Sequence, residues 1–566
     1  MDIEEIGASL DVPQPNRSQR DFNKALVFPK KGSKHVDGVD ECKSSVPGTQ
    51  KIWIKTFGCS HNVSDSEYME GILSNYGYRI ESEQDKADLW LVNSCTVKDP
   101  SQAAFMNIVH KARETNHPIV VAGCVSQADQ NIKGLEGVSV VGVTQIDRVV
   151  EGVEQTLEGQ TVRLIGKKAL PALDLPKVRR NALIEIIPLS TGCLGSCTYC
   201  KTKHARGKLG SYSLEAIVER AKKAIEDGVS EIWLSSEDTG AYGIDLGTNI
   251  GALLLALLEV LPDELEGGTG GVMLRVGMTN PPYILEHLAV VAQVLRHPKV
   301  YSFLHVPVQA GSNRVLVAMN REYTVEEYMR VADYLIANVP DMTVATDIIC
   351  GFPNETEDDF SATLTMVDRY KLAITNISQF YPRPGTPAAK MKRIPTQIVK
   401  NRSRRLTTLF ESFTPYVHLP GRRLKVWFNT EVSDDGRHSI GHTKGYVKVN
   451  VPFDATLPGR SRYVEVQECK RFHVEGVISA DQVTVPAEEA AAAGGAAAIA
   501  GTGSKYSSSS SASGTGTVSS SSTGADRGGL WTPYSALILG ACVASGIVLF
   551  GAYRYGPSAR GAARQR

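Results

Sequence analysis

Apolar and polar residues alternate along the middle of the chain in a way that predicts two α/β domains. Between residues 51 and 159, stretches of helical periodicity separate the apolar runs KIWIKTFG, ADLWLVNSC, PIVVAGCVS and VSVVGV. This alternation is typical of a parallel α/β domain. It resumes over 183–412 with the runs LIEIIPLS, EIWLSSED, MLRVGM, YSFLHVPV, MTVATDIIC and ITNISQFY. These runs predict an incomplete (β/α)6 barrel, whose chemistry belongs at the carboxyl ends of its strands.

The pattern changes to period two over 413–480, where the runs are LKVWFNTEV, GYVKVNV, RYVEVQE and HVEGVIS. Short alternating strands broken by Gly, Asp and Pro predict a small antiparallel β-barrel. A polar connector with Pro171 and Pro176 occupies 160–182, between the two α/β domains. The stretch from Lys390 to Arg405, rich in Lys and Arg and without an acid, predicts a basic helix.

Both ends of the chain lack the alternating apolar pattern of the middle. Residues 1–50 show no periodicity and predict a flexible leader. Residues 481–530 are dominated by Ala, Gly, Ser and Thr, which bury too little apolar surface to offset the entropy of ordering, so a disordered linker is expected. Residues 531–553 carry no charge and would span roughly 34 Å at about 1.5 Å per residue, enough for one transmembrane helix.

The alternative for 531–553 is a buried core helix, but the sequence predicts no domain beside it. Tyr534 and Tyr553 suit a membrane interface, and the position of the span predicts a tail-anchored protein. The arginines that follow the span would favour a cytoplasmic tail by the positive-inside rule. We nevertheless expect the bulk of the chain in the cytosol, because the first thirty residues lack the apolar core of a signal peptide.

Composition and charge narrow the choice of function. Lys plus Arg and Asp plus Glu both total 61, so no overall positive charge is available for unspecific binding to nucleic acid. Contact with RNA would depend on local patches such as 390–405, whose alternative interpretation is a solvated helix face. Ten widely spaced cysteines do not form the framework of a secreted disulfide protein, so a reducing compartment is expected.

Three cysteines, Cys193, Cys197 and Cys200, follow the first predicted barrel strand with the spacing C-x3-C-x2-C. Three thiolates on one loop can hold three irons of a 4Fe–4S cluster and leave the fourth iron open to a ligand. The alternative is a zinc site, which would require a fourth ligand such as His204 on the same loop.

A second set, Cys59, Cys95 and Cys124, lies at the ends of three apolar runs in the N-terminal domain. Because parallel strands end at one edge of a sheet, these thiols should converge, which predicts a second three-cysteine cluster site. The alternative is three small core residues. The other cysteines fit neither set, and we assign them to the leader, a core strand, a barrel strand and the membrane helix: Cys42, Cys350, Cys469 and Cys542.

The spacing TGCLGSCTYC at the start of a barrel resembles the radical S-adenosylmethionine superfamily. The resemblance implies that the open iron binds the methionine part of S-adenosylmethionine, whose reductive cleavage yields a 5′-deoxyadenosyl radical. It also implies that Glu237, which ends the second strand as SSED, binds the methionine ammonium, and that the backbone of Tyr199 lies near the adenine. Ser235 and Ser236 replace the usual double glycine, so a solvated strand-end carboxylate is the alternative for Glu237.

The order of TFGC, NSC and GC, then C-x3-C-x2-C, then a small β-barrel resembles the methylthiotransferase family over residues 51–480. The motifs HVPVQAGSNRVLVAMNREYT, TDIICGFPNETEDDF and FYPRPGTPA agree. The resemblance implies two 4Fe–4S clusters, S-adenosylmethionine, a TRAM module that binds tRNA, and insertion of a methylthio group at an unreactive C–H bond. It also implies an electron donor and a sulfur source, both of unknown identity.

Within this family, LSTGCLGSCTYCKTKHARGKLGSY, SSEDTGAYG and the C-terminal anchor resemble the eukaryotic enzymes that act on N6-threonylcarbamoyladenosine in tRNA. This implies the endoplasmic reticulum membrane, with a mitochondrial or plastid outer membrane as the alternative. The other functional hypotheses are a methylthiotransferase acting on isopentenyladenosine in tRNA, and a non-catalytic, membrane-tethered protein that binds zinc and RNA.

Overall fold

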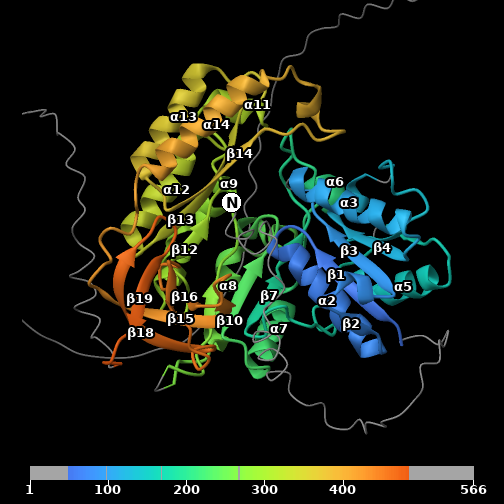
Figure 1. The fold of residues 1–566 in the computed structure, drawn as a ribbon. Helices are drawn as coiled ribbons and strands as arrows, with labels where there is room; N and C mark the ends of the chain where they lie inside the picture. The colour runs from blue at the N-terminus through green and yellow to red at the C-terminus, as the bar shows by residue number, and fades with distance from the viewer. Residues whose placement is uncertain (1–48, 97–98, 130, 167, 266–267, 483–566) are drawn as a thin grey trace, which may run out of the picture. The chain divides into compact units, whose positions relative to one another are not determined.

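The computed structural model describes residues 49–96, 99–129, 131–166, 168–265 and 268–482 (Figure 1). The expected leader up to residue 48, the linker from residue 483 and the transmembrane helix at 531–553 lie outside these residues. In the part of the chain that is described, no single helix has the length and apolar composition of a membrane span. Among the described residues, the helical segments Thr239–Leu246 and Ile250–Val260 have this length and composition only when taken together, and the chain bends by 104° between them.

The N-terminal domain is a six-stranded parallel sheet with the strand order β2-β1-β3-β4-β5-β6. Its strands are β1 (Lys51–Thr56), β2 (Arg79–Glu81), β3 (Leu89–Ser94), β4 (Ile119–Gly123), β5 (Ser139–Val141) and β6 (Arg163–Leu164). Its helices are α2 (Ser60–Tyr76), η1 (Gln84–Lys86), α3 (Asp99–Glu114), α4 (Cys124–Ala128), η2 (Ile146–Arg148) and α5 (Val149–Leu157). The sheet extends past the boundary predicted at residue 159, because β6 pairs with β5.

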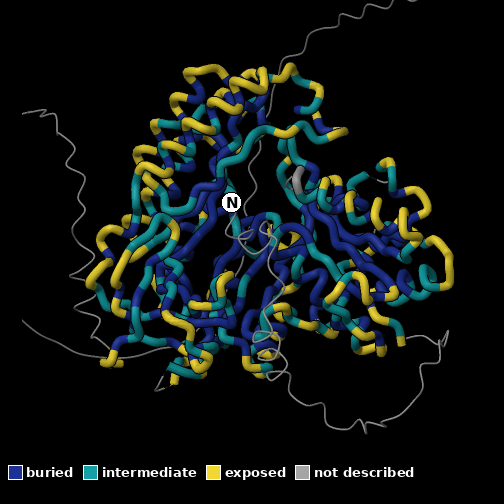
Figure 2. The backbone as a smooth tube through the Cα atoms, viewed as in Figure 1, coloured by how far each residue is buried: buried dark blue, intermediate teal, exposed yellow. Residues whose placement is uncertain are grey.

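Apolar side chains on both faces of this sheet explain its continuous hydrophobic runs. Along β3, Trp90 and Val92 belong to one buried cluster, and Leu89 and Leu91 belong to the cluster on the opposite face. Successive residues of a strand point to opposite faces, so a strand covered by helices on both sides must be apolar at every position. Figure 2 shows these central strands buried, with exposed residues on the outer helices and loops.

The second domain contains six parallel strands in two three-stranded sheets, β11-β10-β7 and β12-β13-β14. A parallel bridge between Leu274 and Val300 connects the two sheets. The expected incomplete (β/α)6 barrel is therefore confirmed. Its parallel strands are β7 (Ile184–Pro188), β10 (Glu231–Ser235), β11 (Met273–Arg275), β12 (Phe303–His305), β13 (Thr343–Cys350) and β14 (Ile374–Gln379).

The longer helices of this domain cover the outside of the partial barrel, and α6 lies beside the N-terminal domain (Figure 1). The helices of the domain are α6 (Thr202–Arg206), α7 (Leu214–Glu226), η3 (Thr239–Ala241), η4 (Ile244–Leu246), α8 (Ile250–Val260), α9 (Pro281–Ile284), η5 (Leu285–His287), α10 (Leu288–Arg296), α11 (Asn313–Ala318), α12 (Val325–Asn338), α13 (Glu357–Tyr370), η6 (Pro387–Lys390) and α14 (Thr396–Glu411). The short strands β8 (Ser190–Thr191) and β9 (Gly210–Ser211) pair with each other beside the cysteine loop.

The C-terminal domain is a closed barrel with the order β15-β16-β17-β19-β18. Its strands are β15 (Arg423–Val432), β16 (His438–Thr443), β17 (Lys448–Pro452), β18 (Arg460–Cys469) and β19 (Val474–Ile478). The sequence prediction lacked β16, because its run HSIGHT has few apolar residues. The barrel docks on the second domain through Lys444, whose Nζ donates to the carbonyl of Leu295 at 2.7 Å.

Buried charges join the connector to both α/β domains. Glu185 of β7 is fully buried, and it accepts hydrogen bonds from Lys177 at 2.9 Å and from Arg220 of α7. Lys177 also pairs with Glu67 of α2 at 3.2 Å. Burial raises the pKa of Glu185, but Lys177, Arg220 and Arg179 outweigh that effect and lower the pKa to about 2.

Replacing Glu185 by Gln should destabilise the protein strongly, because it leaves three cations near an uncharged amide. Breaking a buried ion pair costs about 3–5 kcal/mol of unfolding free energy. Glu219→Gln on α7, the helix that carries Arg220, is the matched control; its side chain is 79% exposed and lies 3.9 Å from Lys222, so little change is expected.

Thermal unfolding of the two variants at several pH values tests this. The folded-state pKa of Glu185 lies below the ordinary value of 4.5, so its contribution is complete above pH 4.5 and is lost as the pH falls through about 2. Equal melting temperatures for the two variants at neutral pH would show that the network does not hold the domains together.

Candidate active site

The three cysteines of the N-terminal domain lie at one edge of its sheet, as the sequence predicts. Cys59 precedes the first turn of α2, Cys95 directly follows β3, and Cys124 is the first residue of α4, directly after β4. Gly58 has a φ of 102°, and a Cβ at this position would lie 2.5 Å from the Cys95 sulfur. Only glycine allows the chain between β1 and α2 to pass this close to the second thiol.

Burial dominates the electrostatics of these thiols. Burial raises the pKa of Cys59 well above its ordinary value, the neighbouring Cys95 raises it further, and Arg206 lowers it. The pKa of Cys124 is also raised by burial and lowered by the charge of Arg206 and by a hydrogen bond from it. The thiolate is the form that binds metal, and the charge of Arg206 favours that form.

Arg206 comes from the second domain, at the end of the helix that follows the other cysteine set. Its side chain is only 2% exposed, and its guanidinium pairs with Asp65 of α2 at 2.6 Å and with Glu237 at 3.1 Å. It also donates to Asn62 Oδ1 at 2.8 Å. One buried guanidinium therefore connects two carboxylates of different domains with the thiols of the N-terminal set.

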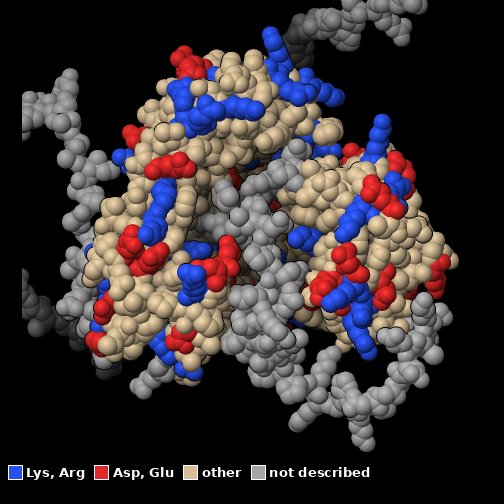
Figure 3. All heavy atoms as spheres, viewed as in Figure 1, with Lys and Arg blue, Asp and Glu red and all other residues tan. Residues whose placement is uncertain are grey.

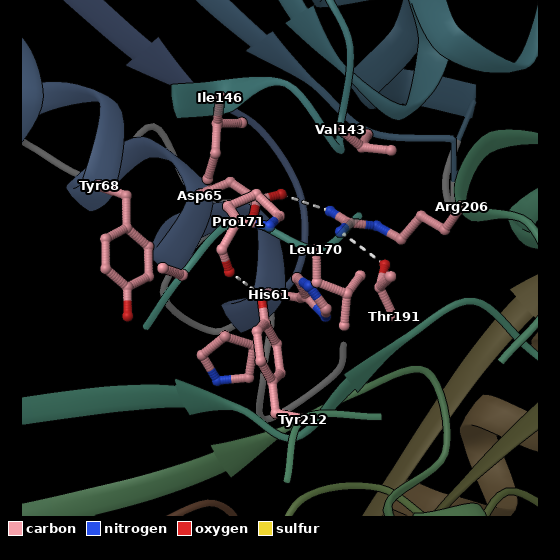
Figure 4. A pocket seen from close by; sticks show the side chains of 12 residues that line it. His61, Asp65, Tyr68, Val143, Ile146, Leu170, Pro171, Thr191, Arg206 and Tyr212 are labelled. Atoms are coloured by element: carbon pink, nitrogen blue, oxygen red, sulfur yellow. Dashed lines mark hydrogen bonds and ion pairs between the residues drawn. The ribbon is translucent and has the colours of Figure 1, made fainter. Parts of the chain in front are cut away.

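Figure 4 shows this guanidinium beside a small cavity of about 20 Å³. Arg206 extends toward Asp65, and Thr191 lies on its other side, where its hydroxyl accepts a hydrogen bond from Arg206 at 3.5 Å. The cavity is lined by both domains and by Pro171 of the connector. Its volume allows about one water molecule, so it leaves no room for a substrate.

The second cysteine set lies on the loop between β8 and α6. A Cβ at Gly195 would lie 3.7 Å from the Cys193 sulfur and 3.9 Å from the Cys197 sulfur, so these two thiols flank one glycine. Burial first, and then the charges of Asp238 and Cys200, raise the pKa of Cys193 to about 12. Arg321 donates to the Cys197 sulfur at 3.2 Å.

The segment around Arg321 also forms hydrogen bonds with the backbone of the cysteine loop. Asn320 donates to the Ser196 carbonyl at 2.9 Å, and the Thr198 amide donates to the Met319 carbonyl at 2.9 Å. On the other side, Lys203 donates to the Leu194 carbonyl at 2.7 Å. Each thiol set thus has one arginine beside its sulfurs and a loop fixed by hydrogen bonds.

The other two predicted site residues are Glu237, which lies between the domains, and Tyr199, whose ring packs inside the radical domain. The side chain of Glu237 is 10% exposed; it pairs with Arg206 and lies 3.5 Å from the ring of His61 of α2, so its carboxylate lies at the contact between the domains. The adjacent Asp238 raises the pKa of Cys193 and binds Asn280. The ring of Tyr199 packs edge-on against Phe352, with ring centroids 6.2 Å apart.

Cys350 is buried at the end of β13, and Cys469 ends β18, half-buried. Both positions agree with the core-strand and barrel-strand assignments. Within the described residues, no three Cys, His, Asp or Glu side chains lie close enough to hold a single metal ion. A 4Fe–4S cluster does not require this, because each of its three protein thiolates binds a different iron.

Comparison with known proteins identifies the domains. Residues 51–142 match the Uncharacterized protein family UPF0004, and residues 187–367 match the Radical SAM superfamily. The threonylcarbamoyladenosine tRNA methylthiotransferase of Xenopus laevis is 49% identical over 486 residues, which cover 84% of this chain and 85% of that protein. The protein of the same name from Drosophila melanogaster is 53% identical over 448 residues, 78% of this chain and 80% of that protein.

The chain belongs to the threonylcarbamoyladenosine tRNA methylthiotransferase family. Its cofactors are S-adenosylmethionine and two 4Fe–4S clusters. The chemistry of the site fits the clusters, since each domain offers three buried or half-buried thiols with a cation beside them. Among solved structures, the radical S-adenosylmethionine methyltransferase TsrM from Kitasatospora setae aligns with a TM-score of 0.43 and 14% identity, covering 60% of this chain and 75% of that chain.

Sequence reasoning for this family member missed Arg206, Arg321 and Asp238. Each lies near a motif that was noted: Arg206 ends KTKHAR, Arg321 lies in MNREYT, and Asp238 follows Glu237. Their importance is visible only in the folded chain, because Arg206 contacts a thiol of the other domain and Arg321 contacts a thiol 124 positions away in its own domain.

Replacing Arg206 by Gln should remove the N-terminal cluster while leaving the other cluster in place. The loss of the cation leaves Asp65 and Glu237 unpaired and favours protonated thiols at Cys59 and Cys124. Iron per chain after anaerobic reconstitution should fall by about half, because two similar clusters share the iron.

Arg321→Gln is the reciprocal variant, since it removes the donor to Cys197 instead. It should retain the N-terminal cluster and weaken the other one. Iron and sulfide analysis, with electron paramagnetic resonance spectra of the reduced proteins, separates the two cases. Full iron content in a folded Arg206→Gln variant would contradict a role for this guanidinium in holding the cluster.

Proposed function

We propose that this chain is a tRNA methylthiotransferase that adds a methylthio group to C2 of N6-threonylcarbamoyladenosine next to the anticodon. The observation that carries the proposal is the pairing of two three-cysteine sites on adjacent domains, connected by Arg206. A reaction that needs both a radical and a sulfur donor requires two such sites near each other. The similarity to proteins of that name over 84% of the chain supports the choice of substrate.

Each triad is assigned one cluster. Cys193, Cys197 and Cys200 would hold the cluster of the radical domain, and the N-terminal triad would hold the second one. When bound, the first cluster supplies the electron that cleaves S-adenosylmethionine, and the second supplies sulfur. The protein contributes the fixed positions of the thiols, the cations beside them, and loops at the carboxyl ends of the barrel strands that shield the reaction from water.

The tRNA is proposed to bind along the basic stretch from Lys390 to Arg405 and the C-terminal barrel. Figure 3 shows Lys and Arg side chains gathered at the end of the second domain where α13 and α14 lie. The patch is smaller than the sequence suggests, because Arg402 is buried and pairs with Glu355 at 2.7 Å. Arg405 is exposed but pairs with Glu357. Five other exposed cations of the stretch remain for phosphates, namely Lys390, Lys392, Arg393, Lys400 and Arg404.

The membrane anchor at 531–553 is likewise a proposal, with the cysteine domains in the cytosol and the endoplasmic reticulum as the membrane. Its support is the uncharged composition of that segment and the flexible composition of the linker before it. The electron donor and the sulfur source are proposed to be separate proteins or small molecules that approach the domains from the cytosol.

Cys59→Ala and Cys197→Ala should separate the two halves of the reaction. Cys59→Ala should abolish methylthiolation and keep cleavage of S-adenosylmethionine to 5′-deoxyadenosine, because the radical-domain triad is intact. Cys197→Ala should abolish both. Cys469→Ala, in the C-terminal barrel, is the control and should keep both activities.

Nucleoside mass spectrometry of tRNA and chromatography of 5′-deoxyadenosine supply the two measurements. Methylthiolated product from the Cys59 variant at the wild-type rate would disprove the sulfur-donor role of its triad. A wild-type protein that modifies isopentenyladenosine and leaves threonylcarbamoyladenosine unmodified would overturn the proposed substrate.

Deleting residues 530–566 should release the protein from membranes without changing its activity on purified tRNA. The composition of residues 481–530 predicts a coil, for which we expect a root-mean-square reach of roughly 40 Å, so the domains need not contact the bilayer. Fractionation of tagged full-length and truncated chains, with protease added outside intact vesicles, is the measurement. Full-length protein in the soluble fraction, or protection of the cysteine domains, would reject the anchored orientation.

A further inference from the structure

Lys201 is a buried lysine beside the radical-domain cysteines. It directly follows Cys200 in the sequence and is only 9% exposed. Within the described residues, its ammonium has no hydrogen-bond or ion-pair partner. Its Nζ atom is not completely shielded from solvent. A buried ammonium without a partner costs free energy, so a group from outside the chain is expected to pair with it.

The loop after β14 positions Lys201 at the carboxyl ends of the barrel strands. The Ala388 amide donates to the Thr198 carbonyl at 2.9 Å, and Arg383 donates to the Tyr199 carbonyl at 3.5 Å. Gly385, between them, lies against Lys201, and a Cβ there would be 3.4 Å from its Nζ. The ammonium is therefore enclosed by the cysteine loop and this segment, where barrel enzymes bind their substrates.

The neighbouring cations already have protein partners. Those beside the two cysteine sets that are hydrogen-bonded to protein groups are Arg206, Arg321, Lys203 and Arg383. Lys201 is thus the cation in this region whose charge is still available to a ligand. The proposed substrate carries a matching charge, because the threonine of threonylcarbamoyladenosine ends in a free carboxylate, whereas an isopentenyl group has none.

We propose that Lys201 binds the carboxylate of the threonylcarbamoyl group and so selects this nucleoside over uncharged N6-modified adenosines. This inference rests on the function proposed above. Lys201 is a specificity residue rather than a catalytic one, since the carboxylate is remote from the carbon that reacts. A hydrogen bond between charged groups in a buried site corresponds to about a 10- to 100-fold effect on affinity.

The test compares two RNA substrates with four proteins. One substrate is an anticodon stem-loop carrying threonylcarbamoyladenosine, and the other is the same RNA with the threonine carboxylate converted to its methyl ester. The proteins are the full-length wild type, Lys201→Gln, Lys201→Arg, and the exposed control Lys208→Gln from the same region. Iron content and cleavage of S-adenosylmethionine without RNA are measured for each.

The wild type and Lys208→Gln should lose about 10- to 100-fold in kcat/KM when the carboxylate is esterified. Lys201→Gln should lose a similar factor on the acid and should not distinguish acid from ester. Lys201→Arg should recover most of the discrimination. Iron content and cleavage without RNA should stay at the wild-type level in all variants, because the ammonium serves the substrate and not the cofactors.

Three outcomes would overturn the assignment. If wild-type protein uses the ester as well as the acid, no cation recognises the carboxylate. If Lys201→Gln still discriminates, another residue does so. If Lys201→Gln loses cleavage of S-adenosylmethionine without RNA, the ammonium binds the cofactor instead. Failure of the wild type to modify the acid at all would reject the proposed function, which is a separate result.

Discussion

The contact between Arg206 and the N-terminal domain is the interaction on which the arrangement of the site depends. Arg206 belongs to the radical domain, and its guanidinium pairs with Asp65 of the N-terminal domain. It also pairs with Glu237 of its own domain. A buried charge of this kind is stable only when carboxylates and hydrogen-bond acceptors surround it. Satisfying Arg206 therefore requires both domains to be in contact, with their cysteine sets at the junction.

Both cysteine sets combine buried thiols with a neighbouring arginine. Burial favours protonated thiols, and each set has an arginine that favours the thiolate, Arg206 for Cys124 and Arg321 for Cys197. Both arginines come from outside the segment whose thiols they contact. A cysteine motif alone therefore does not decide whether its thiols are deprotonated. An arginine from another segment of the chain supplies the charge that favours the thiolate.

Charge placement also separates the structural cations from the one left for substrate. Lys177 and Arg220 both pair with Glu185 inside the contact between the connector and the domains. Arg402 of α14 is likewise buried and pairs with Glu355. Lys201 lies at the opposite extreme, buried and without an anion in the described part of the chain. Whether a Lys or Arg pairs with an acid of the protein depends on which residues lie beside it in the fold, and the sequence alone does not show this.

Much of the architecture follows from the sequence. The continuous apolar runs of the α/β domains and the alternating runs of the C-terminal barrel predicted the strands β1, β3 to β5, β7, β10 to β15 and β17 to β19, and the cysteine spacings predicted both thiol sets. Runs that are too short or too polar to stand out were missed, namely β2, β6, β8, β9 and β16. Their pairing depends on hydrogen bonds from neighbouring strands rather than on their own side chains.

The direction of single side chains was decided by the tertiary structure. Glu237 and Asp238 are adjacent, and the sequence could not tell which of them faces the radical-domain thiols; the strand end directs Glu237 to Arg206 and Asp238 toward Cys193 and Asn280. The sequence by itself determined the alternation that predicts the domains, the spacing of the two cysteine sets and the resemblance to the family, because those depend on local periodicity, spacing and motifs. Only the tertiary structure decided which charges meet, because ion pairs such as Arg206 with Asp65 join residues 141 positions apart.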